Sequence, residues 1–197
     1  MPISAIVFGG RRASLVPLVF EARDWTHGVL VGAAMGSETT AAATGQVGVV
    51  RRDPMAMKPF CGYNFADYFA HWLSFDRPET QLPKIFHVNW FRKGSDGGFL
   101  WPGFGDNLRV LEWIIGRVQG HAGGQETPIG IMPRPSDLNL AGIELSAEAE
   151  AGLFGLDRKG WRNEFEDIGN GFAAYGPRLP GVLLEQHQHI AAGLGEP

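Results

Sequence analysis

Short apolar runs that end at glycine, proline or polar turns dominate the first two thirds of the chain. Residues 3–8 form one such run, which stops at Gly9 and Gly10. A nearly continuous apolar run of this length, bounded by glycine, is typical of a buried strand that leads into a tight turn. The same criterion predicts strands over residues 15–20, 28–35, 84–91 and 129–132.

Apolar positions with helical spacing alternate with these runs. An aromatic face predicts a helix over residues 64–74, which Asn64 can cap. A second helix is expected to begin at Asp106 or Asn107, either of which can cap it, and to end near Gly120. Further helices are predicted over residues 147–154, 158–175 and 181–192.

This alternation predicts an α/β fold with a mixed sheet and flanking helices. Residues 1–133 are expected to form the mixed α/β part, and residues 134–197 a peripheral layer of helices. Residues 37–49 interrupt the pattern, because they are rich in Thr, Ala and Gly and have no large apolar side chain before Val47. A segment with so little to bury is expected to be mobile.

Composition narrows the functional classes. The 197 residues fit one ordinary domain or a large piece of a bigger one, and the net charge of −4 argues against a general nucleic-acid binder. Cys61 is the only cysteine, so no internal disulfide can form and a reducing compartment, the cytoplasm, is expected. We expect no membrane span and no signal peptide. The abrupt start into a strand suggests a piece of a longer protein.

Several catalytic motifs are missing from the sequence. The chain contains no G-x-x-x-x-G-K-[ST] phosphate loop, no G-x-G-x-x-G fingerprint and no H-E-x-x-H zinc motif. His187 and His189 are two residues apart, so on a helix they point in different directions, and solvated histidines are the simpler interpretation. We therefore predict no metal site and no complete catalytic centre in this chain.

The most informative stretch is FHVNWFRKGSDGGFLWPGFGDN, residues 86–107. Its loops can bring Phe91, Phe99 and Phe104 to one rim, where aromatic rings stack on a flat base for about 1–3 kcal/mol each. Asn107 adds both a donor and an acceptor, which a purine edge requires. On spacing alone, the plainer alternative is that these phenylalanines fill the core.

Longer motifs occur in a fixed order over residues 3–133: ISAIVFGGRR, SETTAAA, DPMAMKPFCGYNF, HWLSF, KIFHVNWF, FLWPGFGDN and RVLEW. Together they resemble the GTP-dependent phosphoenolpyruvate carboxykinases, in which FLWPGFGEN is the usual form. The resemblance implies the carboxy-terminal part of that family's nucleotide-binding domain. It also implies the family's gluconeogenic reaction, which converts oxaloacetate and GTP into phosphoenolpyruvate, carbon dioxide and GDP.

The resemblance also implies which residues bind the nucleotide. The family's guanine-binding phenylalanines and asparagine match Phe91, Phe99, Phe104 and Asn107, and contacts to the base are expected from the whole run that includes Gly105 and Asp106. In the family's GGRR turn an arginine meets the phosphates, and Arg11 matches it as a catalytic group that stabilises the transferring phosphoryl. Residues 37–49 match a lid that closes over the active site.

The sequence departs from the family pattern at several positions. Gly36 replaces a frequent arginine, Asp106 replaces the usual glutamate, and Thr44 differs from the residue usual at that position of the family's lid. Family members are about three times as long, and their phosphate loop, manganese ligands and oxaloacetate-binding arginines have no counterpart here. The chain alone is thus expected to be inactive. Separately, the parent enzyme is expected to be monomeric. The alternatives are a non-catalytic packing or association module with a collapsed pocket and, more remotely, an aromatic-lined sugar site.

Overall fold

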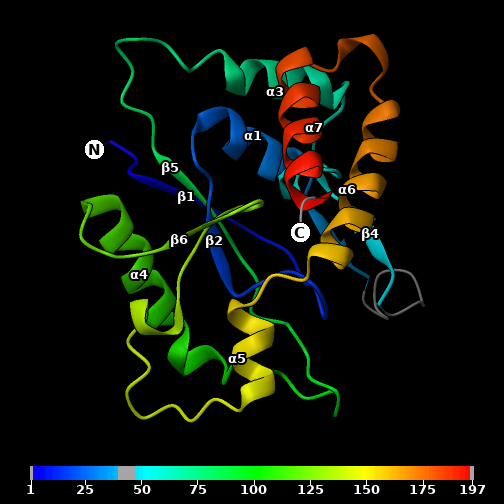
Figure 1. Ribbon diagram of the computed structural model, residues 1–197. Helices are drawn as coiled ribbons and strands as arrows, with labels where there is room; N and C mark the ends of the chain where they lie inside the picture. Colours follow the sequence, from blue (N-terminus) through cyan, green and yellow to red (C-terminus); the bar gives the residue numbers. More distant parts are fainter. Residues whose placement is uncertain (1, 40–47, 196–197) are drawn as a thin grey trace.

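A computed structural model describes residues 2–39 and 48–195 and has a five-stranded mixed sheet with helices on both faces (Figure 1). The α/β class with a mixed sheet is therefore confirmed. The first strand is parallel to its neighbour, and all other pairs in this sheet are antiparallel. The strand order is β1 (Ala5–Gly9), β5 (Lys84–Val88), β2 (Val19–Glu21), β7 (Gly130–Met132) and β6 (Gln125–Thr127).

The helices form two groups separated by the sheet. One group consists of α1 (Trp25–Ala33), α3 (Phe65–Leu73), α6 (Arg158–Ala173) and α7 (Gly181–Gly195). The other consists of α4 (Asn107–Gln119) and α5 (Ala147–Phe154). Single turns of 3-10 helix occur at Pro54–Ala56, Phe104–Asp106, Pro135–Asp137 and Gly176–Arg178.

Alternation along β5 explains the two cores. Ile85 is buried in the cluster with α1, α6 and α7, while its neighbour Phe86 is buried in the cluster with α4 and α5. Successive side chains of a strand point to opposite faces, so a central strand covered on both faces must be apolar throughout. The run KIFHV meets this demand at Ile85, Phe86 and Val88. Lys84, at the start of the strand, pairs with Glu21, and His87 stacks on Phe20 with ring centroids 5.3 Å apart.

The predicted strand over residues 28–35 is wrong, because residues 28–33 belong to helix α1 and Ala34 caps its end. Asp24 caps the helix by accepting a hydrogen bond from the His27 backbone N–H. The helix is buried on nearly every side, so it lacks the polar face that reveals a helical period. Gly28 lies directly against Ile85, and any larger side chain there would clash with β5.

Other expectations agree more closely with the structure. The helix expected over 64–74 is α3, with Asn64 as its cap, and α5 has the predicted bounds. The strand expected over 15–20 is β2, which begins at Val19 and ends at Glu21. Leu15 has a φ of 67°, so it cannot belong to an extended strand. The last helices were expected to be peripheral. Instead, α6 and α7 share buried side chains with α1 and the sheet, so they complete the main core.

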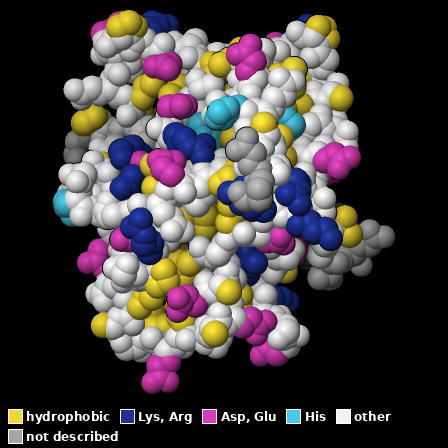
Figure 2. Space-filling view, viewed as in Figure 1, with side chains coloured by type: hydrophobic (Ala, Val, Ile, Leu, Met, Phe, Trp, Pro, Cys, Tyr) yellow, Lys and Arg dark blue, Asp and Glu magenta, His cyan; other side chains and the backbone are white. Residues whose placement is uncertain are grey.

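The surface seen in Figure 2 carries interspersed basic and acidic side chains, and hydrophobic side chains show between them in its lower part, where α4 and α5 lie. Leu108, Leu111 and Ile115 give α4 an exposed apolar stripe. Ile3 and Val7 are also exposed, next to and on the edge strand β1. None of the helices in residues 2–39 and 48–195 is long and apolar enough to cross a membrane.

Two buried histidines should make the fold sensitive to mild acid. Burial, with smaller contributions from neighbouring arginines, lowers the pKa of both His27 and His87 to about 4. The unfolded chain takes up these protons below about pH 6.5 whereas the folded chain does not, so stability falls as the pH drops from 6.5 towards 4. By pH 5 each histidine should cost about 2 kcal/mol, measurable by urea unfolding at pH 7.5 and 5.

Replacing one histidine tests this assignment. His87→Phe should remove about half of the acid-induced loss, since the ring can still stack on Phe20 but no longer titrates. His189→Gln is the matched control, because His189 is exposed on α7. An unchanged pH dependence in His87→Phe would contradict the assignment.

Candidate functional site

The turn after β1 carries Arg11, and strand β3 (Gly36–Glu38) holds it. The Arg11 backbone N–H donates to Ser37 Oγ at 3.1 Å, and its carbonyl accepts from the Glu38 N–H at 2.8 Å. Gly10 lies so close to the Gly36 carbonyl that a Cβ would be 2.7 Å from its oxygen. Glycine is therefore required at position 10 to bring the arginine turn onto β3. The Arg11 side chain itself is exposed.

The same strand borders the segment that resembles the family's lid. β3 pairs antiparallel with β4 (Val50–Arg52), so the two ends of the segment lie side by side. Of the expected lid, residues 40–47 lie outside the described part of the chain.

Asn89 joins the arginine turn to the first aromatic residue of the site. This asparagine directly follows strand β5 and is completely buried. Its Oδ1 accepts from the backbone N–H groups of Arg12 at 3.3 Å and Phe91 at 3.2 Å. Its Nδ2 donates to the carbonyls of Arg12 at 2.9 Å and Val16 at 3.0 Å. All four hydrogen-bonding positions of the amide are thus filled.

Two of the three expected phenylalanines meet. The Phe91 and Phe99 ring centroids are 6.1 Å apart, with the planes at 72°. The Arg11 guanidinium carbon lies 4.9 Å from the centre of the Phe91 ring, and Lys93 Nζ lies 5.6 Å from that of Phe99. The residue expected to contact phosphate and a residue expected to contact the base are therefore immediate neighbours.

Phe104 is placed differently from the other two. It is 94% exposed and, within the part of the chain that the structure describes, makes no ring contact with Phe91 or Phe99. Gly103 turns the chain before it with a φ of 118°, which favours glycine, and Gly105 has open space around its Cα. The phenyl ring is available to a ligand rather than being used in the core.

The start of α4 supplies the polar groups. Asp106 forms an ion pair with Arg109 at 2.9 Å, and Arg109 also donates to the Asn139 carbonyl. Asn107 Oδ1 accepts a 2.9 Å hydrogen bond from the indole N–H of Trp101. The region thus combines the rings of Phe91, Phe99 and Phe104 with the Arg11 guanidinium and the Asn107 amide, groups able to stack on a flat ring, bind an anion and form hydrogen bonds.

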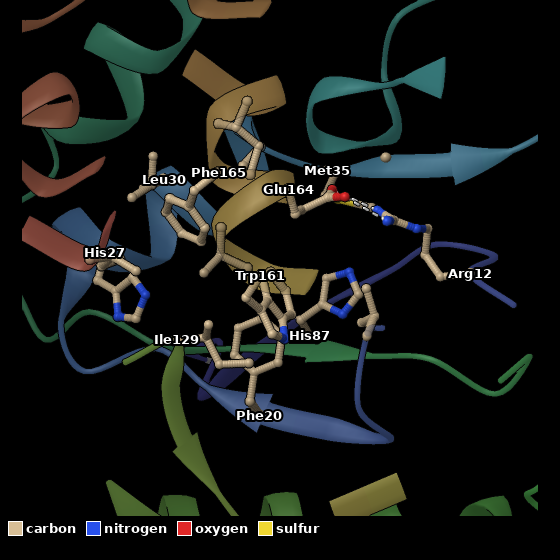
Figure 3. Close-up of a pocket in the computed structure, with 16 residues that line it drawn as sticks. Arg12, Phe20, His27, Leu30, Met35, His87, Ile129, Trp161, Glu164 and Phe165 are labelled. Atoms are coloured by element: carbon tan, nitrogen blue, oxygen red, sulfur yellow. Dashed lines mark hydrogen bonds and ion pairs between the residues drawn. The ribbon is translucent and has the colours of Figure 1, made fainter. Parts of the chain in front are cut away.

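A partly buried ion network supports the arginine turn, and Figure 3 shows its Arg12–Glu164 pair. Glu164 of α6 accepts a bidentate pair from Arg12 at 2.8 and 2.7 Å and a third bond from Arg52 at 2.7 Å. Arg52 also pairs with Asp167. Burial would raise the pKa of Glu164, but the hydrogen bonds and charges of Arg12 and Arg52 outweigh it and hold that pKa below its usual value.

Arg12 and Glu164 also line an internal cavity of about 50 Å³, whose remaining walls are mostly apolar side chains. This cavity differs from the site predicted from the sequence, since none of the expected nucleotide ligands lines it. In residues 2–39 and 48–195, no three His, Cys, Asp or Glu side chains come together in an arrangement that could hold a metal ion.

Comparison with known proteins places this geometry in context. The family model of the phosphoenolpyruvate carboxykinase C-terminal P-loop domain matches residues 1–192. The chain belongs to this family. The resemblance that the motifs indicated is thereby confirmed. The family is named for its phosphate loop, but the 197 residues contain no G-x-x-x-x-G-K-[ST] motif.

Three relatives named as GTP-dependent phosphoenolpyruvate carboxykinases illustrate the similarity. The Thermoplasma volcanium protein is 52% identical over 195 residues, covering 99% of this chain and 33% of the relative. The proteins of Anaeromyxobacter sp. strain K and Chlamydia muridarum are 53% and 50% identical, covering 95% and 96% of the chain and 32% of each relative. The chain therefore spans about a third of the length of these carboxykinases.

Two residues that organise the candidate site were not predicted from the sequence. Asn89 and Glu164 bind no expected ligand, but they fix the turn that carries Arg11. Asn89 has a sequence signal, because it is a polar residue that directly follows an apolar strand and opens the NWFR motif. Glu164 has none, since its partners Arg12 and Arg52 are more than 100 residues away along the chain.

Proposed function

We propose that this chain provides the guanine-nucleotide site of a GTP-dependent phosphoenolpyruvate carboxykinase, a cytoplasmic gluconeogenic enzyme. The complete enzyme converts oxaloacetate and GTP into phosphoenolpyruvate, carbon dioxide and GDP. The observation that carries the proposal is the packing of the Arg11 guanidinium on the Phe91 ring, with Asn89 bonding the backbones of Phe91 and of Arg12, the residue next to Arg11. Family membership and about 50% identity to enzymes of that name support it.

Each proposed ligand has a distinct physical role. Phe91, Phe99 and Phe104 offer faces or edges to a flat base, and the run Gly105–Asp106–Asn107 lets backbone and amide groups approach its edge. Arg11 places a planar cation within reach of phosphate oxygens, where it would stabilise charge that develops during phosphoryl transfer. GTP supplies the phosphoryl group in that reaction.

The metal and the organic substrate need other residues. No described cluster fits the family's manganese, so this chain's residues are assigned no step through the metal. We propose that the ligands for manganese, oxaloacetate and phosphoenolpyruvate belong to the remaining two thirds of the carboxykinase, and that the chain alone does not turn over substrate.

A packing or association module is the second candidate. The exposed stripe of Leu108, Leu111 and Ile115 on α4 favours it, because surfaces of this kind commonly mark interfaces. Equal and weak responses to GTP and ATP would support this candidate over the nucleotide site.

Removing the exposed ring of Phe104 tests the proposal. Phe104→Ala should weaken GDP binding by about 1–3 kcal/mol, which is about 5- to 160-fold, because a stacking face is lost. Stability should hardly change, since the ring is 94% exposed. Isothermal titration calorimetry with GDP measures the affinity, and Phe60→Ala, another exposed phenylalanine, is the control. Unaltered affinity in Phe104→Ala would exclude Phe104 from the site.

A further inference from the structure

A single hydrogen bond determines which end of the Asn107 amide is free. The indole N–H of Trp101 lies 2.9 Å from Asn107 Oδ1. An indole nitrogen can only donate, whereas an asparagine amide has an accepting oxygen at one end and a donating nitrogen at the other. Trp101 must therefore bind the oxygen end, and the opposite orientation would set two donors against each other.

Burial makes this orientation difficult to reverse. Trp101 is 1% exposed and belongs to the core cluster that also contains Trp113 and Leu153. Its indole cannot turn away without disturbing that core. Asn107, in contrast, is only partly buried at the start of α4. Among the described residues, no acceptor binds Asn107 Nδ2, so the amino end remains available to a ligand.

The two purines differ at the position that such an amide would read. Guanine presents an oxygen at C6, which accepts a hydrogen bond, while adenine presents an amino group there, which donates. An amide restricted to donation can pair with the guanine oxygen but faces an unfavourable donor–donor contact with adenine. Stacking on the phenylalanines cannot make this distinction, because every base has an aromatic face.

We propose that Trp101 is a specificity-determining residue: by occupying Asn107 Oδ1 it commits the Asn107 amide to donation and selects 6-oxopurine over 6-aminopurine nucleotides. Trp101 itself need not touch the base, and it acts as a positioning residue. This inference rests on the proposed guanine-nucleotide site and names the contact that gives the site its base preference.

Removing only the indole donor tests the idea. In Trp101→Phe the Asn107 amide can turn about its terminal bond and offer its oxygen to adenine. The ratio of GDP to ADP affinity, measured by calorimetry on the full chain, should fall about tenfold, the size of one base-edge hydrogen bond. IDP, which has the 6-oxo group but lacks the 2-amino group of guanine, should follow GDP in both proteins.

Trp113→Phe is the matched control. Trp113 is also buried, in the same cluster, but its indole donates to the Gly123 carbonyl. It should lose stability without changing the GDP-to-ADP ratio. Asn107→Asp gives a second reading that does not depend on the Trp101 variant folding. An acceptor-only carboxylate keeps the bond to Trp101 but cannot donate to guanine, so GDP should lose more affinity than ADP.

The outcomes distinguish failure of the Trp101 role from failure of the proposed nucleotide site. If the unaltered chain binds GDP and Trp101→Phe keeps the original GDP-to-ADP ratio, Trp101 does not set specificity and the inference is overturned while the nucleotide site stands. If IDP behaves like ADP in the unaltered chain, the 6-oxo contact is not what is read, and the inference also fails. If the unaltered chain binds no nucleotide, the proposed function fails and takes the inference with it.

Discussion

Glu164→Leu should destabilise the fold by about 3–5 kcal/mol, because it leaves the buried Arg12 and the partly buried Arg52 without their shared carboxylate. The loss should appear as a lower urea midpoint at pH 7.5. Arg12 is the more affected partner, since its guanidinium donates to both Glu164 oxygens and is almost fully buried. Its turn carries Arg11, so GDP affinity is expected to fall as well.

Two further variants separate charge from shape. Glu164→Gln keeps one accepting oxygen and the side-chain length, so its loss should lie between those of the unaltered chain and Glu164→Leu. Glu166→Leu, on an exposed position of the same helix, should change stability by less than about 0.5 kcal/mol. If Glu164→Leu proved as stable as Glu166→Leu, the ion network would contribute nothing to the fold.

Asn89→Ala by itself should lower the free energy of unfolding by about 3–5 kcal/mol, because it removes four hydrogen bonds from a completely buried site. GDP affinity should also fall among the molecules that remain folded, since Phe91 and Arg12, the neighbour of Arg11, lose the amide that bonds their backbones. Urea unfolding gives the first quantity, and calorimetry under conditions where unfolding shows the variant to be folded gives the second.

Asn89→Asp is informative beside this variant. The carboxylate keeps both accepting contacts to the Arg12 and Phe91 N–H groups but cannot donate to the Arg12 and Val16 carbonyls. GDP binding should therefore recover in part while stability remains low. Asn170→Ala, at an exposed position of α6, is the control that should change neither. A full recovery of stability in Asn89→Asp would mean that the two donated bonds are unimportant.

Much of the fold was predictable because apolar runs and helical periods reflect burial. The strands β1, β5 and β7 and the helices α3 and α5 follow from these patterns and from caps such as Asn64. Helix α1 was not predictable in this way, since burial on nearly all sides erases the period. The role of α6 and α7 in the core also escaped prediction, because periodicity locates an apolar face but not what it packs against.

For the candidate site, the expected ligands were suggested by the sequence but most of their supporting residues were not. The aromatic and arginine ligands were suggested by motif resemblance, and the structure brings Arg11, Phe91 and Phe99 together. Their assignment as nucleotide ligands is a proposal. The supporting roles of Asn89, Glu164 and Trp101 rest on tertiary contacts, and of the two that hold the arginine turn only Asn89 has a sequence signal. The Asn89–Arg12 hydrogen bond spans 77 residues and the Arg12–Glu164 ion pair spans 152, so both depend on the tertiary arrangement.

The edge position of β1 has a practical consequence for every experiment above. Within the described sheet this strand bonds only to β5, so one row of its backbone groups is open, and Val7 on the strand is exposed. Open edges of this kind recruit other chains into β-pairing as concentration rises. Affinities and unfolding midpoints should therefore be compared over a dilution series, because self-association at high concentration would mimic both added stability and lost ligand binding.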